Sequence, residues 1–208
     1  MARSDPVAIA RTVSDVRKRP GMFVGGSDGD GVLNLVLELI ANAYDQHLAG
    51  RCSRAAIDLS SDGTITVADD GPGFAAEGGE GVPPLRQLLT TRSTTPTVDG
   101  HRPHVHLGVG TMGLFVVAAL SELFSLRSVR RGIRTTTSYA RGEVVEHVTT
   151  APTTERDGTR ITFRPDPTIF MHPRVLRVAL ARYLENLSFL AASASSLALA
   201  IDLEQAFP

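Results

Sequence analysis

The feature that most constrains the fold is an apolar stretch, residues 31–49, interrupted by one narrow row of polar side chains. The spacing predicts a helix that is apolar on nearly every side, and such a helix is buried. The polar exceptions are separated by steps of four, four and three residues, which places them in one row: Asn34, Glu38, Asn42 and Asp45, followed by Gln46. A buried carboxylate is costly unless it is paired or faces a polar cavity. We therefore expect this helix to line a wet or ligand-filled site.

Glu38 and Asn42 lie one helical turn apart in this row. A carboxylate in such a site can polarise an attacking water. An amide oxygen can hold Mg²⁺, which accepts few protein ligands and keeps waters and phosphate oxygens. The alternative is a helix whose polar edge is only solvated, and this segment alone leaves the two readings about even.

The rest of the chain alternates helical and strand patterns without an internal repeat or a linker. Ser61-Asp62-Gly63 predicts a hairpin between two short β-patterned runs. Strands are expected at 55–59, 64–68, 123–129, 134–140, 143–149, 159–164 and 196–203, and helices at 6–19, 31–49, 82–89, 114–122 and 175–187. The pattern predicts a single α+β domain over 1–208, with one layer of helices on a mixed sheet.

The second strand of that hairpin ends in Asp69-Asp70-Gly71-Pro72-Gly73. A carboxylate there can accept a hydrogen bond from an exocyclic amine such as adenine N6, and glycines let a flat ring approach the backbone. The alternative is a plain turn, because Asp, Gly and Pro are the usual turn residues. The turn by itself favours that alternative.

A polar stretch from 90 to about 107 precedes a glycine loop, Gly108 to Gly113, at the start of a predicted helix. So long a stretch without secondary structure indicates a lid or disorder. Gly108 to Gly113 reads G-x-G-x-x-G, and backbone N–H groups at a helix start can bind phosphate. The dinucleotide-binding form of this motif is not supported, because no apolar strand precedes it and 127–134 holds no acid. We interpret the basic segment 127–134 as a solvated edge strand.

Composition narrows the function classes further. The formal net charge of −1 over 208 residues gives no global field toward DNA or anionic lipid. Cys52 is the only cysteine, so neither an intrachain disulfide nor a cysteine-rich zinc site can form. No apolar run approaches a membrane span and the N-terminus has no apolar signal core, so we expect a soluble cytoplasmic protein without membrane contact.

Taken together, these motifs resemble the ATPase domains of the DNA gyrase B and topoisomerase IV type, within the GHKL family. The resemblance covers essentially the whole chain, with matching motifs in order at 16–23, 38–45, 69–73, 116–121, 157–159 and 184–190. It implies the Bergerat fold, a two-layer α/β sandwich in which helices cover one face of a mixed, mostly antiparallel sheet. It also implies an N-terminal arm and motif over 1–23 and an ATP lid over 90–110.

The resemblance further implies roles for individual residues. Glu38 would be the general base and Asn42 the Mg²⁺ ligand. Asp69, with a water and Thr159, would read adenine. The remaining nucleotide-binding positions would be Asp45, Gly71 and Gly73, together with the triphosphate loop Gly108, Val109, Gly110, Thr111, Met112 and Gly113.

Departures from the family pattern bear on activity. Pro72 stands where the family has an arginine over the adenine, and Gln46 replaces the acid that pairs with it. His104 replaces a lid lysine. The chain also stops where the family's transducer domain would begin, and that domain supplies a lysine to the γ-phosphate.

We therefore expect a stand-alone ATP-binding protein that hydrolyses ATP slowly with Mg²⁺, and whose lid closure drives contact with a protein partner or a second copy. The alternative is a nucleotide-binding switch that does not hydrolyse ATP. A protein kinase of the same superfamily is a third reading, but no phosphoacceptor-histidine helix is visible. No direct DNA binding is predicted from this chain.

Overall fold

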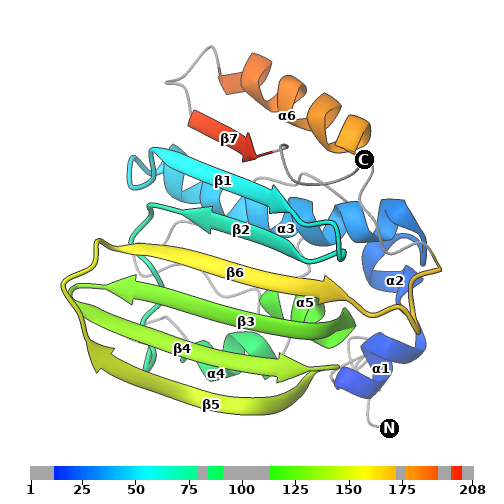
Figure 1. The fold of residues 1–208 in the computed structure, drawn as a ribbon, viewed down its shortest axis with the longest axis horizontal. Helices are drawn as coiled ribbons and strands as arrows, with labels where there is room; N and C mark the ends of the chain where they lie inside the picture. The colour runs from blue at the N-terminus through cyan, green and yellow to red at the C-terminus, as the bar shows by residue number, and fades with distance from the viewer. Residues whose placement is uncertain (1–11, 79–83, 91–112, 172–176, 192–197, 203–208) are drawn as a thin grey trace, which may run out of the picture.

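The computed structural model describes residues 12–78, 84–90, 113–171, 177–191 and 198–202. In this part of the chain, a seven-stranded sheet forms one layer and helices cover one of its faces (Figure 1). The helices are α1 Val13–Lys18, α2 Gly21–Val24, α3 Gly29–Leu48, α4 Leu85–Thr90, α5 Leu114–Leu120 and α6 Arg177–Ala191. The strands are β1 Arg54–Leu59, β2 Ile65–Asp69, β3 Ser121–Arg130, β4 Ile133–Ala140, β5 Glu143–Pro152, β6 Gly158–Pro165 and β7 Ala198–Asp202.

The spatial order of the strands is β5-β4-β3-β6-β2-β1-β7. Only the pair β1 and β7 is parallel, and every other neighbouring pair is antiparallel. The predicted α+β sandwich, with its mixed and mostly antiparallel sheet, is therefore confirmed. None of the described helices combines the length and the apolar composition needed to cross a membrane.

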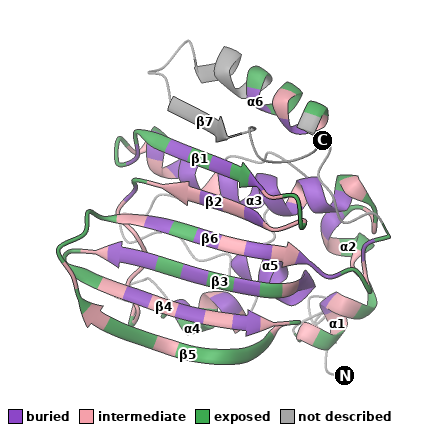
Figure 2. Cartoon of the chain, in the orientation of Figure 1, coloured by how far each residue is buried: buried purple, intermediate pink, exposed green. Residues whose placement is uncertain are grey.

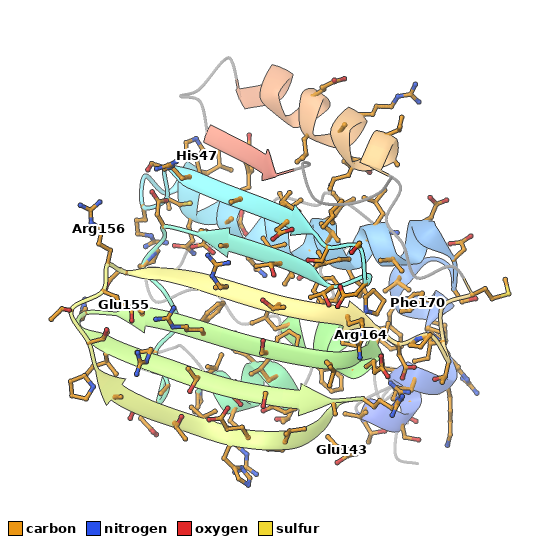
Figure 3. The ribbon with its side chains drawn as sticks, viewed as in Figure 1. His47, Glu143, Glu155, Arg156, Arg164 and Phe170 are labelled. Atoms are coloured by element: carbon orange, nitrogen blue, oxygen red, sulfur yellow. The ribbon has the colours of Figure 1, made fainter. Side chains whose placement is uncertain are left out.

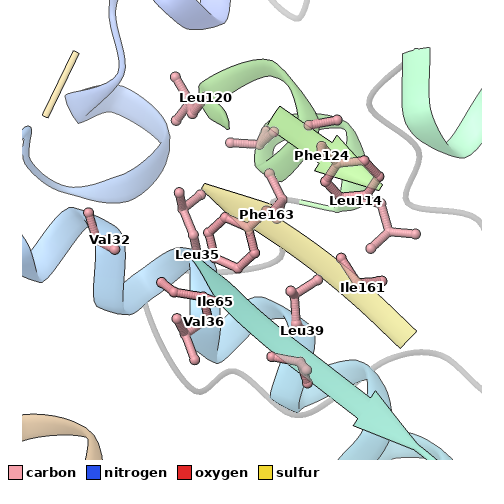
Figure 4. Close-up of a cluster of buried hydrophobic side chains, with 14 of the residues drawn as sticks. Val32, Leu35, Val36, Leu39, Ile65, Leu114, Leu120, Phe124, Ile161 and Phe163 are labelled. Carbon is pink, nitrogen blue, oxygen red and sulfur yellow. The ribbon is translucent and has the colours of Figure 1, made fainter. Parts of the chain in front are cut away.

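Helix α3 is the buried helix that the sequence predicts over 31–49. It begins two residues before the expected start, because the Asp28 carboxylate caps it by accepting hydrogen bonds from the backbone N–H groups of Asp30 and Gly31, at 3.1 and 3.3 Å. Its apolar side chains pack under β2 and β6 (Figure 4). Each fully buried Leu or Val contributes roughly 1.5–3 kcal/mol of hydrophobic stabilisation.

Helix α5 lies in the middle of the helical layer, and all seven of its side chains are buried. Leu114 and Leu120 lie at its two ends in the core shown in Figure 4, which also contains Phe124 of β3 and Phe163 of β6. Burial alternates along much of the central strands (Figure 2), and their buried apolar residues belong to the same core as those of α3 and α5. A short helix that is apolar on every side is stable here only because tertiary packing covers all of it.

Several predictions about local structure were wrong, among them the place of one strand and the end of one helix. The segment 127–134 is not an edge strand: β3 and β4 are both interior, and β5 forms the edge. Charge on a strand does not specify its place in the order, because the helix-free face of an antiparallel sheet is solvated at every strand. The helix expected over 114–122 ends at Leu120, where β3 starts directly.

Candidate functional site

Asp69 ends β2 beside the first residues of β6. Its backbone pairs with that of Thr159, and its Oδ1 accepts a hydrogen bond from the backbone N–H of Gly71 at 2.9 Å. Burial, with a smaller contribution from the charge of Asp70, raises the pKa of Asp69 from an ordinary 3.8 to about 6. Among the described residues nothing donates a hydrogen bond to Oδ2 of Asp69. This carboxylate therefore keeps an acceptor for a ligand.

The adjacent Asp70 is fully engaged within the protein. Its carboxylate accepts hydrogen bonds from the backbone N–H groups of Ser53 and Arg54, at 2.7 and 2.8 Å, and from the Ser53 hydroxyl at 2.5 Å. Burial acts to raise the pKa of Asp70, but these hydrogen bonds outweigh it and lower the pKa to about 2. Asp70 therefore fastens the end of β2 to the start of β1.

The glycines of the turn are required by close packing. At Gly73 the backbone has a φ of 66°, and a Cβ would lie 2.2 Å from the carbonyl oxygen of Val129. At Gly71 a Cβ would lie 2.8 Å from Oδ1 of Asp69. Any side chain at either position would displace backbone or push on the Asp69 carboxylate.

Strand β3 supplies two residues to this turn that the sequence alone does not identify. The Ser128 hydroxyl accepts a hydrogen bond from the backbone N–H of Phe74 at 2.6 Å. The Arg130 guanidinium donates to the carbonyl oxygen of Gly73 at 3.1 Å. The only sequence signal was the basic segment before the Arg131-Gly132 turn, which does not reveal that β3 lies against residues 73–74.

The polar row of α3 divides between two uses. The Asn34 amide donates to the carbonyl oxygen of Val24 at 3.1 Å, and the Gln46 side-chain oxygen accepts from Arg51 Nε at 3.0 Å, so both have partners within the fold. Glu38 and Asp45 are buried, at 6% and 4% exposure, and Asn42 is half-buried between them. The Gln46 side chain lies beside Gly71, within 3.6 Å of where a Cβ would be, which brings this end of α3 next to the Asp69 turn.

Glu38 also reaches the start of α5. Its Oε1 accepts a hydrogen bond from the backbone N–H of Gly113 at 2.8 Å, across a sequence separation of 75 residues. Gly113 is the N-cap of α5 and has a φ of 77°. The other loop residues predicted to wrap a triphosphate, Gly108 to Met112, and the lid segment 91–110 lie outside the described residues.

Side chains with oxygen atoms that could bind a metal ion line the α3 side of this site. Asn42 offers an amide oxygen one turn from two carboxylates, which is a hard-oxygen set that suits Mg²⁺. Within the described ranges no group of three or more His, Cys, Asp or Glu side chains could hold a metal ion. The residues present therefore fit a cation that takes most of its ligands from phosphate and water.

The N-terminal motif closes the opposite end of α5. The guanidinium of Arg17 donates to the carbonyl oxygen of Ala119 at 2.8 Å and pairs with Asp166 at 2.5 Å. Asp166 has no exposed surface and is also paired with Arg141 at 3.1 Å. A short helix is thus anchored through main-chain groups near both ends, by Glu38 and by Arg17.

Comparison with known proteins gives a family match over more than half of the chain. Residues 27–169 match the family model described as "Histidine kinase-, DNA gyrase B-, and HSP90-like ATPase". The DNA gyrase B protein of Thermus thermophilus is 33% identical over 168 residues, which are 79% of this chain and 26% of that protein. The DNA topoisomerase 4 B protein of Rickettsia prowazekii is 35% identical over 159 residues, which are 74% of this chain and 24% of that protein.

A solved structure is similar over most of the described fold. The 43K ATPase domain of Thermus thermophilus gyrase B, in complex with an aminocoumarin, gives a TM-score of 0.74 at 29% identity and covers 91% of this chain and 48% of that one. The chain therefore spans about a quarter of the two relatives' length and about half of this domain structure.

Proposed function

The chain belongs to the family of histidine kinase-, DNA gyrase B- and HSP90-like ATPases, and on that basis we propose that it binds ATP with Mg²⁺ and hydrolyses it slowly. The observation that carries the proposal is Asp69: a half-buried carboxylate, beside two glycines that admit no side chain, with Oδ2 accepting nothing from the described residues. An exocyclic amine is the ligand group that matches such an acceptor.

Each predicted residue then has a task. Asp69 accepts a hydrogen bond from adenine N6, Thr159 supports that contact from β6, and Gly71 and Gly73 lie beside the ring. Glu38 orients the attacking water as general base. Bound Mg²⁺ would neutralise phosphate charge, held by Asn42 with Asp45 nearby, and Gly108 to Gly113 would surround the triphosphate.

Binding is tested by titrating the folded protein with ATP and Mg²⁺ in a calorimeter, for wild type and Asp69→Asn. Losing a charge-assisted hydrogen bond of about 1.5–3 kcal/mol should weaken ATP about 10- to 150-fold. GTP should bind more weakly than ATP to the wild type, because guanine presents a carbonyl oxygen to Asp69 in place of an amine. Asp58→Asn, on the helix-free face of β1, is the matched control. Equal affinity of wild type and Asp69→Asn for ATP would remove the basis of the proposal.

Hydrolysis is tested separately, by single-turnover measurements with radiolabelled ATP. Glu38→Ala should lower the rate by about 10²-fold or more, within the usual range for a general base. Turnover that is the same in Glu38→Ala would rule out hydrolysis at this site.

A second candidate function is a switch that binds ATP without hydrolysing it. One observation favours it: His104 stands where the family pattern has a lid lysine. Tight ATP binding with no turnover, even in the presence of a partner that supplies a lysine, would select this candidate. In either case we propose that the bound nucleotide controls contact with a partner protein or a second copy of the chain.

A further inference from the structure

Helix α5 connects two parts of the molecule that are distant in sequence. At its N-terminus, the N–H of Gly113 holds the Glu38 carboxylate at 2.8 Å. Near its C-terminus, the carbonyl oxygen of Ala119 accepts from the Arg17 guanidinium at 2.8 Å. All side chains of the helix between them are buried. Because the helix is closely packed, a displacement of one end moves the other end as well.

The Arg17 end is held by more than one contact. Arg17 also pairs with Asp166, whose own backbone N–H donates to the carbonyl oxygen of Leu120 at 3.0 Å. Burial acts to raise the pKa of Asp166, but Arg17 and Thr168 outweigh it and lower the pKa to about 2, so the carboxylate stays charged at neutral pH. The guanidinium therefore bridges a fixed anion and the last turn of α5.

Packing beside this contact is equally tight. At Gly142, in the turn between β4 and β5, a Cβ would lie 2.4 Å from a methyl group of Val13 and 3.2 Å from the Cα of Ala119. Helix α1, this turn and the end of α5 are therefore in direct contact. A shift of α5 along its axis would have to break the Arg17 contact first.

We propose that Arg17 is a positioning residue for Glu38, acting through α5: it sets the axial position of the helix and so the place of the Gly113 N–H that holds the Glu38 carboxylate. This inference rests on the proposed role of Glu38 in ATP hydrolysis. It assigns to the N-terminal motif a role at the reacting end of the site, although Arg17 contacts none of the predicted ligand-binding residues that the structure describes.

Arg141 provides a matched control within the same network. Its Nε also pairs with Asp166, and its terminal nitrogen pairs with Glu122 at 3.3 Å, but it makes no contact with the Ala119 carbonyl oxygen. Arg141→Met and Arg17→Met therefore both remove a cation from Asp166, whereas only Arg17→Met also releases α5. Arg17→Lys keeps the charge but cannot bridge both acceptors as the planar guanidinium does.

The experiment combines NMR of the full chain with ATP kinetics. In Arg17→Met, the Gly113 amide resonance should shift and its hydrogen exchange should accelerate, while amides of β2 and β6 keep their exchange rates. The kcat for ATP should fall about ten-fold or more with KM changed less than about two-fold, since misplacement of a reacting group can cost up to ~10²-fold. Arg17→Lys should recover part of both effects, and Arg141→Met should leave both at wild-type values.

The outcomes separate this inference from the proposed function. An unaltered Gly113 amide in Arg17→Met overturns the inference, and so does an equal change in Arg141→Met, because that would make the effect a general loss of stability. If the wild type shows no turnover at all, hydrolysis fails as a function, while the Gly113 amide still reports whether Arg17 positions α5.

Discussion

Two aspartates lie beside opposite ends of β6, and they differ in the number of their hydrogen-bond donors and in the direction of their pKa shift. Asp69 faces the first residues of the strand, accepts one hydrogen bond from Gly71, and has a pKa raised to about 6 by burial. Asp166 follows the last residue, is paired with Arg17 and Arg141, accepts two more hydrogen bonds from Thr168, and has a pKa of about 2. Burial alone therefore does not decide whether the pKa of a carboxylate is raised or lowered. The number of donors that reach it does.

The largest effect on the free energy of unfolding is expected at Asp166, whose carboxylate has more partners than that of Asp69. Asp166→Asn removes a buried charge from two arginines, and breaking a buried pair of this kind typically costs about 3–5 kcal/mol. The free energy of unfolding from urea titration should fall by that amount. Glu155, labelled in Figure 3, pairs with the exposed side chains of Arg127 and Arg134. Glu155→Gln should therefore cost less than about 1 kcal/mol. If Asp166→Asn and Glu155→Gln lose similar amounts of unfolding free energy, the buried and the exposed ion pairs do not differ in their contribution to stability.

The pH dependence of stability should differ in sign at the two ends. The pKa of Asp69 in the folded protein lies above its unfolded value. Its contribution to the free energy of unfolding is therefore fully present below about pH 4 and is lost as the pH rises to about 6. The folded pKa of Asp166 lies below its unfolded value, so its contribution is lost as the pH falls from about 4 to 2.

Asp69→Asn should remove the first of these effects. Relative to wild type, this variant should gain about 2–3 kcal/mol of unfolding free energy between pH 4 and pH 7, from about 1.4 kcal/mol for each pKa unit. Urea titrations at a series of pH values give the comparison. A constant difference over that range would mean that Asp69 is not desolvated in the folded protein.

A smaller effect is expected from the neighbour of Asp69 on β6. Thr159→Val removes one hydroxyl from the edge of the predicted adenine site, and a neutral hydrogen bond is worth about 1 kcal/mol, or roughly five-fold in ATP affinity. Stability should hardly change, because valine fits a strand as well as threonine does. Thr162→Val, further along β6 and on the helix-free face, should bind ATP like wild type. If both variants lose affinity equally, Thr159 has no specific contact with the nucleotide.

Much of this arrangement is predictable from local pattern. The apolar periodicity of 31–49 predicts α3, and the Asp-Gly and Arg-Gly pairs predict the hairpin turns, which have positive φ angles at Gly63, Arg131 and Arg141. Asp69 and the glycines after it read by themselves as a plain turn, and they become a candidate site only through the family resemblance. The place of β3 and β4 inside the sheet is not predictable in this way, because strand order depends on which surfaces pack together.

The contacts that give the site its character come from residues far apart in the chain. Glu38 meets Gly113 across 75 residues, and Arg17 meets Asp166 across 149. The roles of the polar row on α3 also separated only in three dimensions, where Asn34 serves α2 and Glu38 serves α5. A helical wheel places side chains on a face but does not say which neighbour that face will meet.

The order of amino acids is thus enough to establish the family, most of the helices and strands, and the chemical types present in the site. These follow from short-range periodicity, turn chemistry and motif spacing. Folding in three dimensions then selects which carboxylate is left with an open acceptor and which is saturated. That choice depends on donors brought in from distant segments, because hydrogen bonds and ion pairs act only over a few ångströms.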